Sequence, residues 1–212
     1  MGTRNLTMVI SEGKTKVAQY GQWDGYPEVQ GKTILQFLKE CDLKLFKERL
    51  KKLSFISSKK VGKLWSECLI INGQSWNKFK TSELFKTKYP ELSRDTGAKV
   101  LQLIYEGKVF KLLDNSKFIH DSLWCEWVYV IDLDKNRFEV YTNFSQNPLT
   151  KKDRFFTVKY KKDAYYPIKI VKSYSIKKLP TVRQFIKDTT FESHKDLEEL
   201  GYNIIINHKF KQ

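Results

Sequence analysis

A β-hairpin within residues 123–142 is the feature that most constrains the fold of this chain. β-Branched and aromatic residues stand on both sides of the polar turn 134–136 (DKN). Such runs around a short polar turn are typical of two paired antiparallel strands. We therefore predict a long strand over residues 123–133, a turn, and its antiparallel partner over residues 137–142.

A second hairpin is predicted at the beginning of the chain. Residues 4–10 and 14–20 have the alternation of strands, and the segment between them, 11–13 (SEG), consists of turn residues. The loop 21–31 follows, and its three glycines, one proline and two aromatic residues indicate a structured loop and not a flexible linker.

Helical periodicity dominates the middle of the chain. The further elements expected are one bent helix or two helices over 34–50 with an interruption near Cys41 and Asp42, helices over 59–69 and 81–89, a helix capped by Ser93 and ending near Gly107, a strand over 168–176, a helix over 180–189, and a short strand or tail over 203–210. Trp65 and Trp76 are expected to be core or groove aromatics. Strands at both ends with helices between them predict an α+β fold and not a doubly wound parallel sheet.

The composition favours one domain, 1–212, because 41% hydrophobic residues are enough to bury a core of that size. No run approaches the roughly 18 to 20 apolar residues of a membrane span, and the signal-peptide pattern is missing, so we expect no membrane partner and a cytoplasmic location. Three widely spaced cysteines and three distant histidines predict neither a disulfide framework nor a metal site, and no cofactor is expected.

The net charge of +15 favours anionic partners. The excess is concentrated in residues 150–178, where ten basic residues alternate with six aromatic ones, a pattern found on nucleic-acid surfaces. Lys159, Lys161 and Lys162 are the candidate contacts of this basic surface. The alternative is that the lysines only form a solvated face.

The common catalytic signatures are missing from the sequence: it has no Walker loop, no GxGxxG after a strand, no HExxH and no GxSxG. We therefore assign no catalytic residue. His120 beside Asp121 is more typical of a loop pair than of a catalytic dyad.

The beginning of the chain resembles N-terminal-nucleophile hydrolases of the choloylglycine-hydrolase and penicillin-acylase type. The resemblance covers the first 25 to 30 residues, with Gly2-Thr3-Arg4, a strand, a turn, a second strand and then YGQWD at 20–24. It implies a layered α+β fold with antiparallel sheets and flanking helices. In that family a cysteine follows the initiator methionine and acts as the nucleophile, while an arginine and an aspartate after the second strand line the pocket.

This chain departs from the family at the nucleophile. Gly2 stands where the cysteine would be, Gln22 stands near the position of the pocket arginine, and Asp24 agrees with the family. Glycine has no atom with which to form the acyl intermediate, so the resemblance implies a degenerate scaffold. Thr3 would serve as nucleophile only if both Met1 and Gly2 were removed.

Further segments, GTR, QWDGYP, SRDTGA and CEW, are similar to those of a group of phage, bacterial and fungal proteins, and this second resemblance implies no particular activity.

The residues expected to hold a ligand come from the two ends of the first hairpin and from two later segments: Thr3, Arg4, Gln22, Trp23, Asp24, Tyr26, Arg94, Asp95 and Glu126. Trp23 and Tyr26 would stack on a ring, and Arg94 beside a helix N-terminus would bind phosphate. The alternatives are a packed corner at 22–28 and a helix cap with an exposed ion pair at 93–95.

Glu126 is the last of these candidates. Strand alternation over residues 123–133 would place it on the opposite face from Cys125 and Trp127. There it would either enter a pocket or face solvent, and the sequence leaves both open.

Three functions remain in competition. The first is a non-catalytic binding protein on a degenerate amidohydrolase-like scaffold, which holds an anionic, nucleotide-like small molecule and, in a phage setting, would sequester a host immune signal. The second is a hydrolase that uses Thr3 or a combination of Asp24, Asp95, Glu126 and His120. The third is a nucleic-acid-binding or inhibitor protein that acts through residues 150–178. We favour the first, and the sequence leaves the oligomeric state open.

Overall fold

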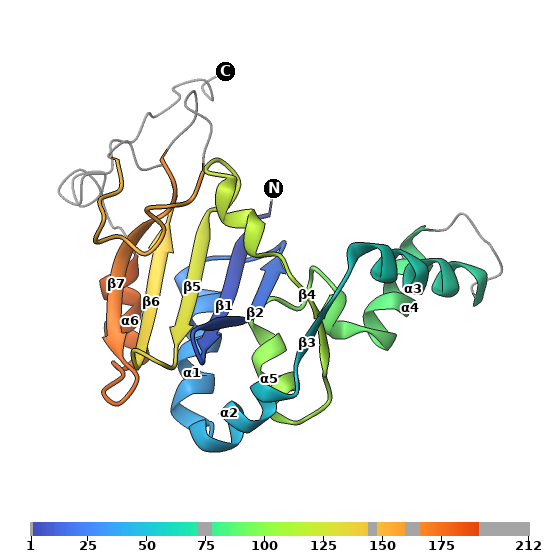
Figure 1. Ribbon diagram of the computed structural model, residues 1–212, viewed down its shortest axis with the longest axis horizontal. Helices are drawn as coiled ribbons and strands as arrows, with labels where there is room; N and C mark the ends of the chain where they lie inside the picture. The colour runs from blue at the N-terminus through green and yellow to red at the C-terminus, as the bar shows by residue number, and fades with distance from the viewer. Residues whose placement is uncertain (1, 72–77, 144–147, 160–165, 191–212) are drawn as a thin grey trace.

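A five-stranded sheet stands at the centre of the molecule (Figure 1). The computed structural model describes residues 2–71, 78–143, 148–159 and 166–190. The strand order is β2-β1-β5-β6-β7, with bounds β1 Asn5–Ser11, β2 Lys14–Gly21, β5 Trp127–Asp132, β6 Arg137–Thr142 and β7 Lys169–Ser175. Both predicted hairpins are confirmed as the antiparallel pairs β1–β2 and β5–β6.

The sheet is mixed, because β1 and β5 run parallel, whereas β6 and β7 pair antiparallel. The expectation of antiparallel sheets is therefore wrong for the central pair. The chain makes several helices after β2 and returns to the sheet beside β1 in the same direction. A second, small sheet joins β3 (Ser54–Ile56) and β4 (Lys111–Leu113), also in parallel. The predicted α+β class is confirmed.

Helices connect and cover the strands. Their bounds are α1 Lys32–Glu40, α2 Leu43–Lys51, α3 Ser58–Ile71, α4 Lys78–Lys88, α5 Val100–Tyr105 and α6 Val182–Thr189, with a π-helical turn at Pro27–Gly31 and 3-10 turns at Pro90–Leu92, Gly97–Lys99 and Ser116–His120. α1 and α6 lie behind the sheet, whereas the hairpin of α3 and α4 projects from one side of the body (Figure 1).

The interruption predicted between the first two helices is confirmed, and Asp42 explains it. Its side chain accepts the backbone N–H groups of Lys44 at 2.7 Å and Leu45 at 3.3 Å, which caps α2. α1 ends just before this cap and buries the apolar stripe Ile34, Leu35, Phe37 and Leu38.

Each face of the sheet carries its own apolar cluster, because side chains alternate along the strands. On the helix-covered face, Val9, Ile131 and Phe138 pack with α1 and with Phe185 of α6. On the opposite face lies a second cluster that includes Leu6, Met8, Val128, Val130, Tyr141 and Phe155. The cover of that face includes residues 118–119 and 155–158, which lie outside the main helices.

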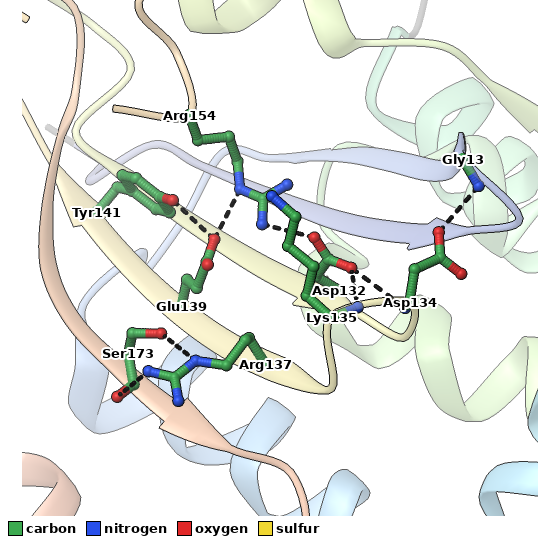
Figure 2. Close-up of polar contacts among 9 residues, drawn as sticks. All are labelled: Gly13, Asp132, Asp134, Lys135, Arg137, Glu139, Tyr141, Arg154 and Ser173. Carbon is green, nitrogen blue, oxygen red and sulfur yellow. Dashed lines mark hydrogen bonds and ion pairs between the residues drawn. The ribbon is translucent and has the colours of Figure 1, made fainter. Parts of the chain in front are cut away.

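Arg154 fastens this cover to the sheet (Figure 2). Its guanidinium lies 2.6 Å from Asp132 Oδ2 and 2.7 Å from Glu139 Oε2, and all three side chains are largely buried. The Tyr141 hydroxyl donates to the same Glu139 oxygen at 2.7 Å. Burial and the neighbouring Glu139 carboxylate raise the pKa of Tyr141, so this hydroxyl stays protonated and remains a donor.

The long strand predicted over residues 123–133 is too long at its start. β5 begins at Trp127, because the preceding residues turn: the backbone N–H of Cys125 donates to the Asp121 carbonyl, and the Asp121 carboxylate accepts from the Trp124 N–H. Cys125 and Trp127 consequently join opposite clusters, and the expectation that they share a face is wrong.

The predicted helix cap at Ser93 is also wrong. Ser93 Oγ accepts the N–H of Asp95 at 3.2 Å within a turn, and the helical stretch begins only at Gly97. Its end near Gly107 is confirmed, because α5 stops at Tyr105 and Gly107 has φ of +72°. The remaining predicted helices and the strand over residues 168–176 are confirmed as α3, α4, α6 and β7. The segment 203–210 and Trp76 lie outside the described residues.

Candidate ligand-binding groove

Most of the candidate residues gather at one end of the sheet, where β1 and β5 begin and β2 ends. The backbone N–H of Gln22 donates to the Arg94 carbonyl at 2.9 Å, which joins the loop after β2 to the segment before α5. The N–H of Arg4 donates to Glu126 Oε1 at 3.0 Å, which joins the start of β1 to the start of β5. Four predicted residues from distant parts of the chain are thus neighbours.

Trp23 connects this end of the sheet to the helical hairpin. Its indole N–H donates to Asp95 Oδ1 at 3.0 Å, and the other oxygen of Asp95 pairs with Lys86 of α4 at 3.2 Å. Gln30 donates its side-chain amide to the Trp23 carbonyl at 3.3 Å. Trp23 is thus held through its indole and through its backbone carbonyl, yet 47% of the residue is exposed.

A groove of about 830 Å³ lies between Trp23 and the helical hairpin. Aromatic and aliphatic side chains make most of its wall, and three polar residues lie on the side of the sheet; the lining residues are Trp23, Val61, Gly62, Trp65, Phe79, Ser82, Phe85, Leu92, Ser93, Arg94 and Asp95. Trp65 and Phe79 remain 36% and 71% exposed, so their ring faces are accessible. Trp65 also packs at a tilt on Phe85, with ring centroids 5.2 Å apart.

Arg94 supplies the cationic group of the groove. Its side chain is exposed, and it makes no hydrogen bond or ion pair with the residues that the structure describes. Because Asp95 is already occupied by Trp23 and Lys86, the guanidinium remains available to an anion.

Tyr20 lies near enough to Arg94 to interact with its charge. Its hydroxyl donates to Gln22 Oε1 at 2.6 Å. Burial raises the pKa of Tyr20, and the positive charges of Arg4 and Arg94 oppose that rise. The Arg4 guanidinium lies 4.3 Å from the centre of the Trp124 ring, a cation–π contact. Both arginines therefore lie near one neutral phenol.

Glu126 is half-buried and contacts the backbone of Arg4. Burial raises its pKa, whereas the N–H of Arg4 that it accepts acts in the opposite direction. The carboxyl fixes the start of β1 against the start of β5, and it does not line the groove. The sequence left open a pocket position and a solvent-facing position, and the structure shows instead a partly buried connection between the two strands.

Three of the predicted ligand residues build the corner and do not line the groove. Thr3 is buried, and its carbonyl accepts the N–H of Gly25 at 3.0 Å. Asp24 is exposed with φ of +51°. Tyr26 is exposed, and its carbonyl accepts the N–H groups that begin the π-helical turn. The corner is therefore not the packed one that the alternative expected, because Asp24 and Tyr26 are exposed, and Trp23 alone of the loop lines the groove.

Gly2 lies directly against the indole of Trp23. A Cβ at position 2 would come within 2.4 Å of the Trp23 ring and 2.6 Å of the Gln22 carbonyl. These separations are far shorter than van der Waals contact. A nucleophilic side chain at this position would therefore require Trp23 to leave the place where it lines the groove.

The helical wall of the groove is the part that the sequence reasoning missed, apart from Trp65. Val61, Phe79 and Phe85 lie on lysine-rich helices, and each helix buries few side chains. Large aromatic residues on helices without a broad apolar stripe are the signal that could have identified them.

The described basic residues of segment 150–178 make several different kinds of contact. Arg154 is engaged with Asp132 and Glu139, and Lys172 pairs with Asp188 at 3.5 Å. Lys159 is exposed, and its carbonyl lies 2.9 Å from His120 Nδ1. Lys161 and Lys162 lie outside the described residues.

Comparison with known protein families, with known proteins and with solved structures gives no match for this chain. In the described ranges, no group of three His, Cys, Asp or Glu side chains is arranged to hold a metal ion. Within those same ranges, the search for a helix of membrane-spanning length and hydrophobicity finds none.

Proposed function

We propose that this chain is a non-catalytic protein that binds an anionic, nucleotide-like small molecule in the groove between Trp23 and the α3–α4 hairpin. One observation carries the proposal: accessible aromatic faces stand next to a guanidinium that no described residue engages. This combination matches the two halves of a nucleotide, a flat apolar base and a phosphate.

The energetics favour such a ligand. Stacking a base on an aromatic side chain contributes about 1–3 kcal/mol, and Trp23, Trp65 and Phe79 offer three such surfaces. Arginine binds phosphate with two parallel hydrogen bonds, which adds direction to the attraction. Arg94 would thus hold the phosphate, while the hydrogen bond from Trp23 to Asp95 fixes one stacking surface in advance.

The close packing of Gly2 against Trp23 supports the non-catalytic part of the proposal. We keep the resemblance to N-terminal-nucleophile hydrolases as a hypothesis of common descent. In this hypothesis, the position of the nucleophile became part of the wall of a ligand-binding groove. In a phage setting, the protein would sequester a host signalling nucleotide.

Titration calorimetry with AMP and ATP tests this function. The variant Arg94→Met should weaken ATP binding at least about tenfold, equivalent to 1.4 kcal/mol. Arg183→Met is the matched control, because Arg183 is exposed on α6 and also lacks a partner among the described residues. Mass spectrometry of the released ligand should return it unchanged. Equal effects of the two substitutions, or conversion of the nucleotide, would contradict the proposal.

A further inference from the structure

The groove does not end at the aromatic pocket. A second pocket of about 530 Å³ adjoins it along α4 and shares Phe79, Ser82 and Asp95 with the first. Glu83, Lys86 and Thr87 complete its lining, so this compartment is more polar. Pockets of about 300–1,000 Å³ each hold one drug-sized ligand. Two adjoining pockets therefore offer room for more than one nucleotide unit.

The hairpin that forms the wall is strongly basic. α3 and α4 contain seven lysines and two glutamates. Lys59, Lys60, Lys63 and Lys88 are exposed, and none of them forms an ion pair with the described part of the chain. The first three interleave with the lining residues Val61, Gly62 and Trp65 on α3. Cationic side chains thus continue beyond the groove on the element that forms its wall.

We infer that the occupant of the groove is a short single-stranded oligonucleotide, whose bases stack on Trp23, Trp65 and Phe79 and whose backbone follows Arg94 and the α3 lysines. This inference rests on the function proposed above and names the ligand class of the same site. An open basic groove with successive aromatic side chains is how proteins bind single strands without sequence preference. An acidic polypeptide would satisfy the lysines and leave the exposed ring faces without a stacking partner.

Fluorescence polarisation with labelled (dA)8, and competition by AMP, (dA)2 and (dA)4, tests the inference. Affinity should rise at each step in length and exceed that for AMP at least about tenfold with eight nucleotides. The logarithm of the (dA)8 association constant should fall linearly with the logarithm of salt concentration, with a slope of roughly −0.7 for each phosphate contacted. Octaglutamate should displace (dA)8 only weakly, because it has no rings to stack.

Two triple variants with the same change in net charge distinguish direct contacts of the α3 lysines with the ligand from the long-range electrostatic attraction of the whole protein. K59E/K60E/K63E should reduce (dA)8 affinity at least about tenfold, flatten the salt slope, and leave AMP affinity within about twofold. K32E/K39E/K44E reverses three exposed lysines on α1 and α2 and should cause a much smaller loss. All six positions are exposed, so the unfolding midpoints should stay close to wild type.

The outcomes distinguish this inference from the proposed function. Three results would each overturn the inference that the ligand is an oligonucleotide and leave the proposed nucleotide binding in place. They are equal affinity for AMP and (dA)8, equal losses of affinity in the two triple variants, and efficient displacement of (dA)8 by octaglutamate. Absence of binding by AMP and by every oligonucleotide would overturn both.

Discussion

Arg154 neutralises two carboxylates on a face of the sheet that is not covered by the main helices. The variant Arg154→Met leaves Asp132 and Glu139 buried without their cation. Removing one member of a buried ion pair costs about 3–5 kcal/mol, and we expect a loss at the lower end because the guanidinium is slightly exposed. Urea denaturation should show this loss as a lower midpoint.

Lys152→Met is the control for that substitution. Lys152 is exposed in the same segment, and its replacement should change stability by less than about 0.5 kcal/mol. The triple variant D132N/E139Q/R154M removes all three charges and should recover most of the loss. A triple variant as unstable as R154M would show that packing, and not charge, causes the effect.

Glu126 provides a pH-dependent test. Burial raises its pKa, so the folded state holds the carboxyl proton more tightly than the unfolded state does. The stability from this proton is complete below the ordinary glutamate pKa and is lost as pH rises through the folded value. The contribution of Glu126 to stability should therefore fall with rising pH in this window, by less than about 1 kcal/mol because the side chain is half-exposed.

The variant Glu126→Gln should lack this contribution, because its amide oxygen still accepts the Arg4 N–H but does not ionise. Urea midpoints measured between about pH 4 and pH 7 give the comparison. A stability difference between the two proteins that stays the same at every pH would contradict the role of Glu126.

Two glycines in different elements should respond in opposite ways to replacement by alanine, one with a gain and the other with a loss of stability. In α3, a Cβ at Gly62 would meet no atom within 4 Å, so Gly62→Ala should stabilise the helix by about 0.5–1 kcal/mol. At Gly31 a Cβ would lie 2.8 Å from the Phe185 ring and 3.0 Å from that of Tyr129. Gly31→Ala should therefore destabilise the protein by about 1–3 kcal/mol. Thermal melts of both variants check the pair, and equal signs would contradict the packing described for them.

Helices and strands that are determined by residues close together in the sequence were predictable from it. The turn residues at 11–13 and 134–136 determine both antiparallel hairpins, and Asp42 determines the boundary between α1 and α2. The cap assigned to Ser93 failed because its hydroxyl has a nearer partner, the N–H of Asp95. β3 and β4 were missed, since each has only three residues and their pairing spans more than fifty positions.

The candidate site was predictable to the extent that its parts lie on recognisable loops. Trp23, Arg94 and Asp95 were identified as ligand residues, and all three line the groove. The opposite wall depends on where the α3–α4 hairpin docks, which no local pattern specifies. Phe79 therefore had no assigned role, and Thr3 and Tyr26 were expected at a pocket although they build the corner beside it.

At the scale of the whole molecule, the parallel pairing of β1 with β5 decides the architecture. It joins residues more than 120 positions apart and places the first strand inside the sheet, between β2 and β5. Strand alternation predicts which residues face the core, but it does not predict which strands become neighbours. The sequence consequently supported the α+β class and left the strand order open.

Burial is distributed unevenly between the sheet and the projecting hairpin, which predicts separate unfolding. In β1 six of seven residues are buried, whereas the fourteen-residue α3 buries only Cys68. Regions with few buried contacts open at lower free energy than the core. In native-state hydrogen exchange, amides of α3 and α4 should exchange at free energies a few kcal/mol below those of β1 and β5. Saturating (dA)8 should slow exchange in the hairpin more than in the sheet, because the ligand would bridge α3 to Trp23 and Arg94. Equal free energies in α3 and β1 would instead make the hairpin part of one cooperative unit.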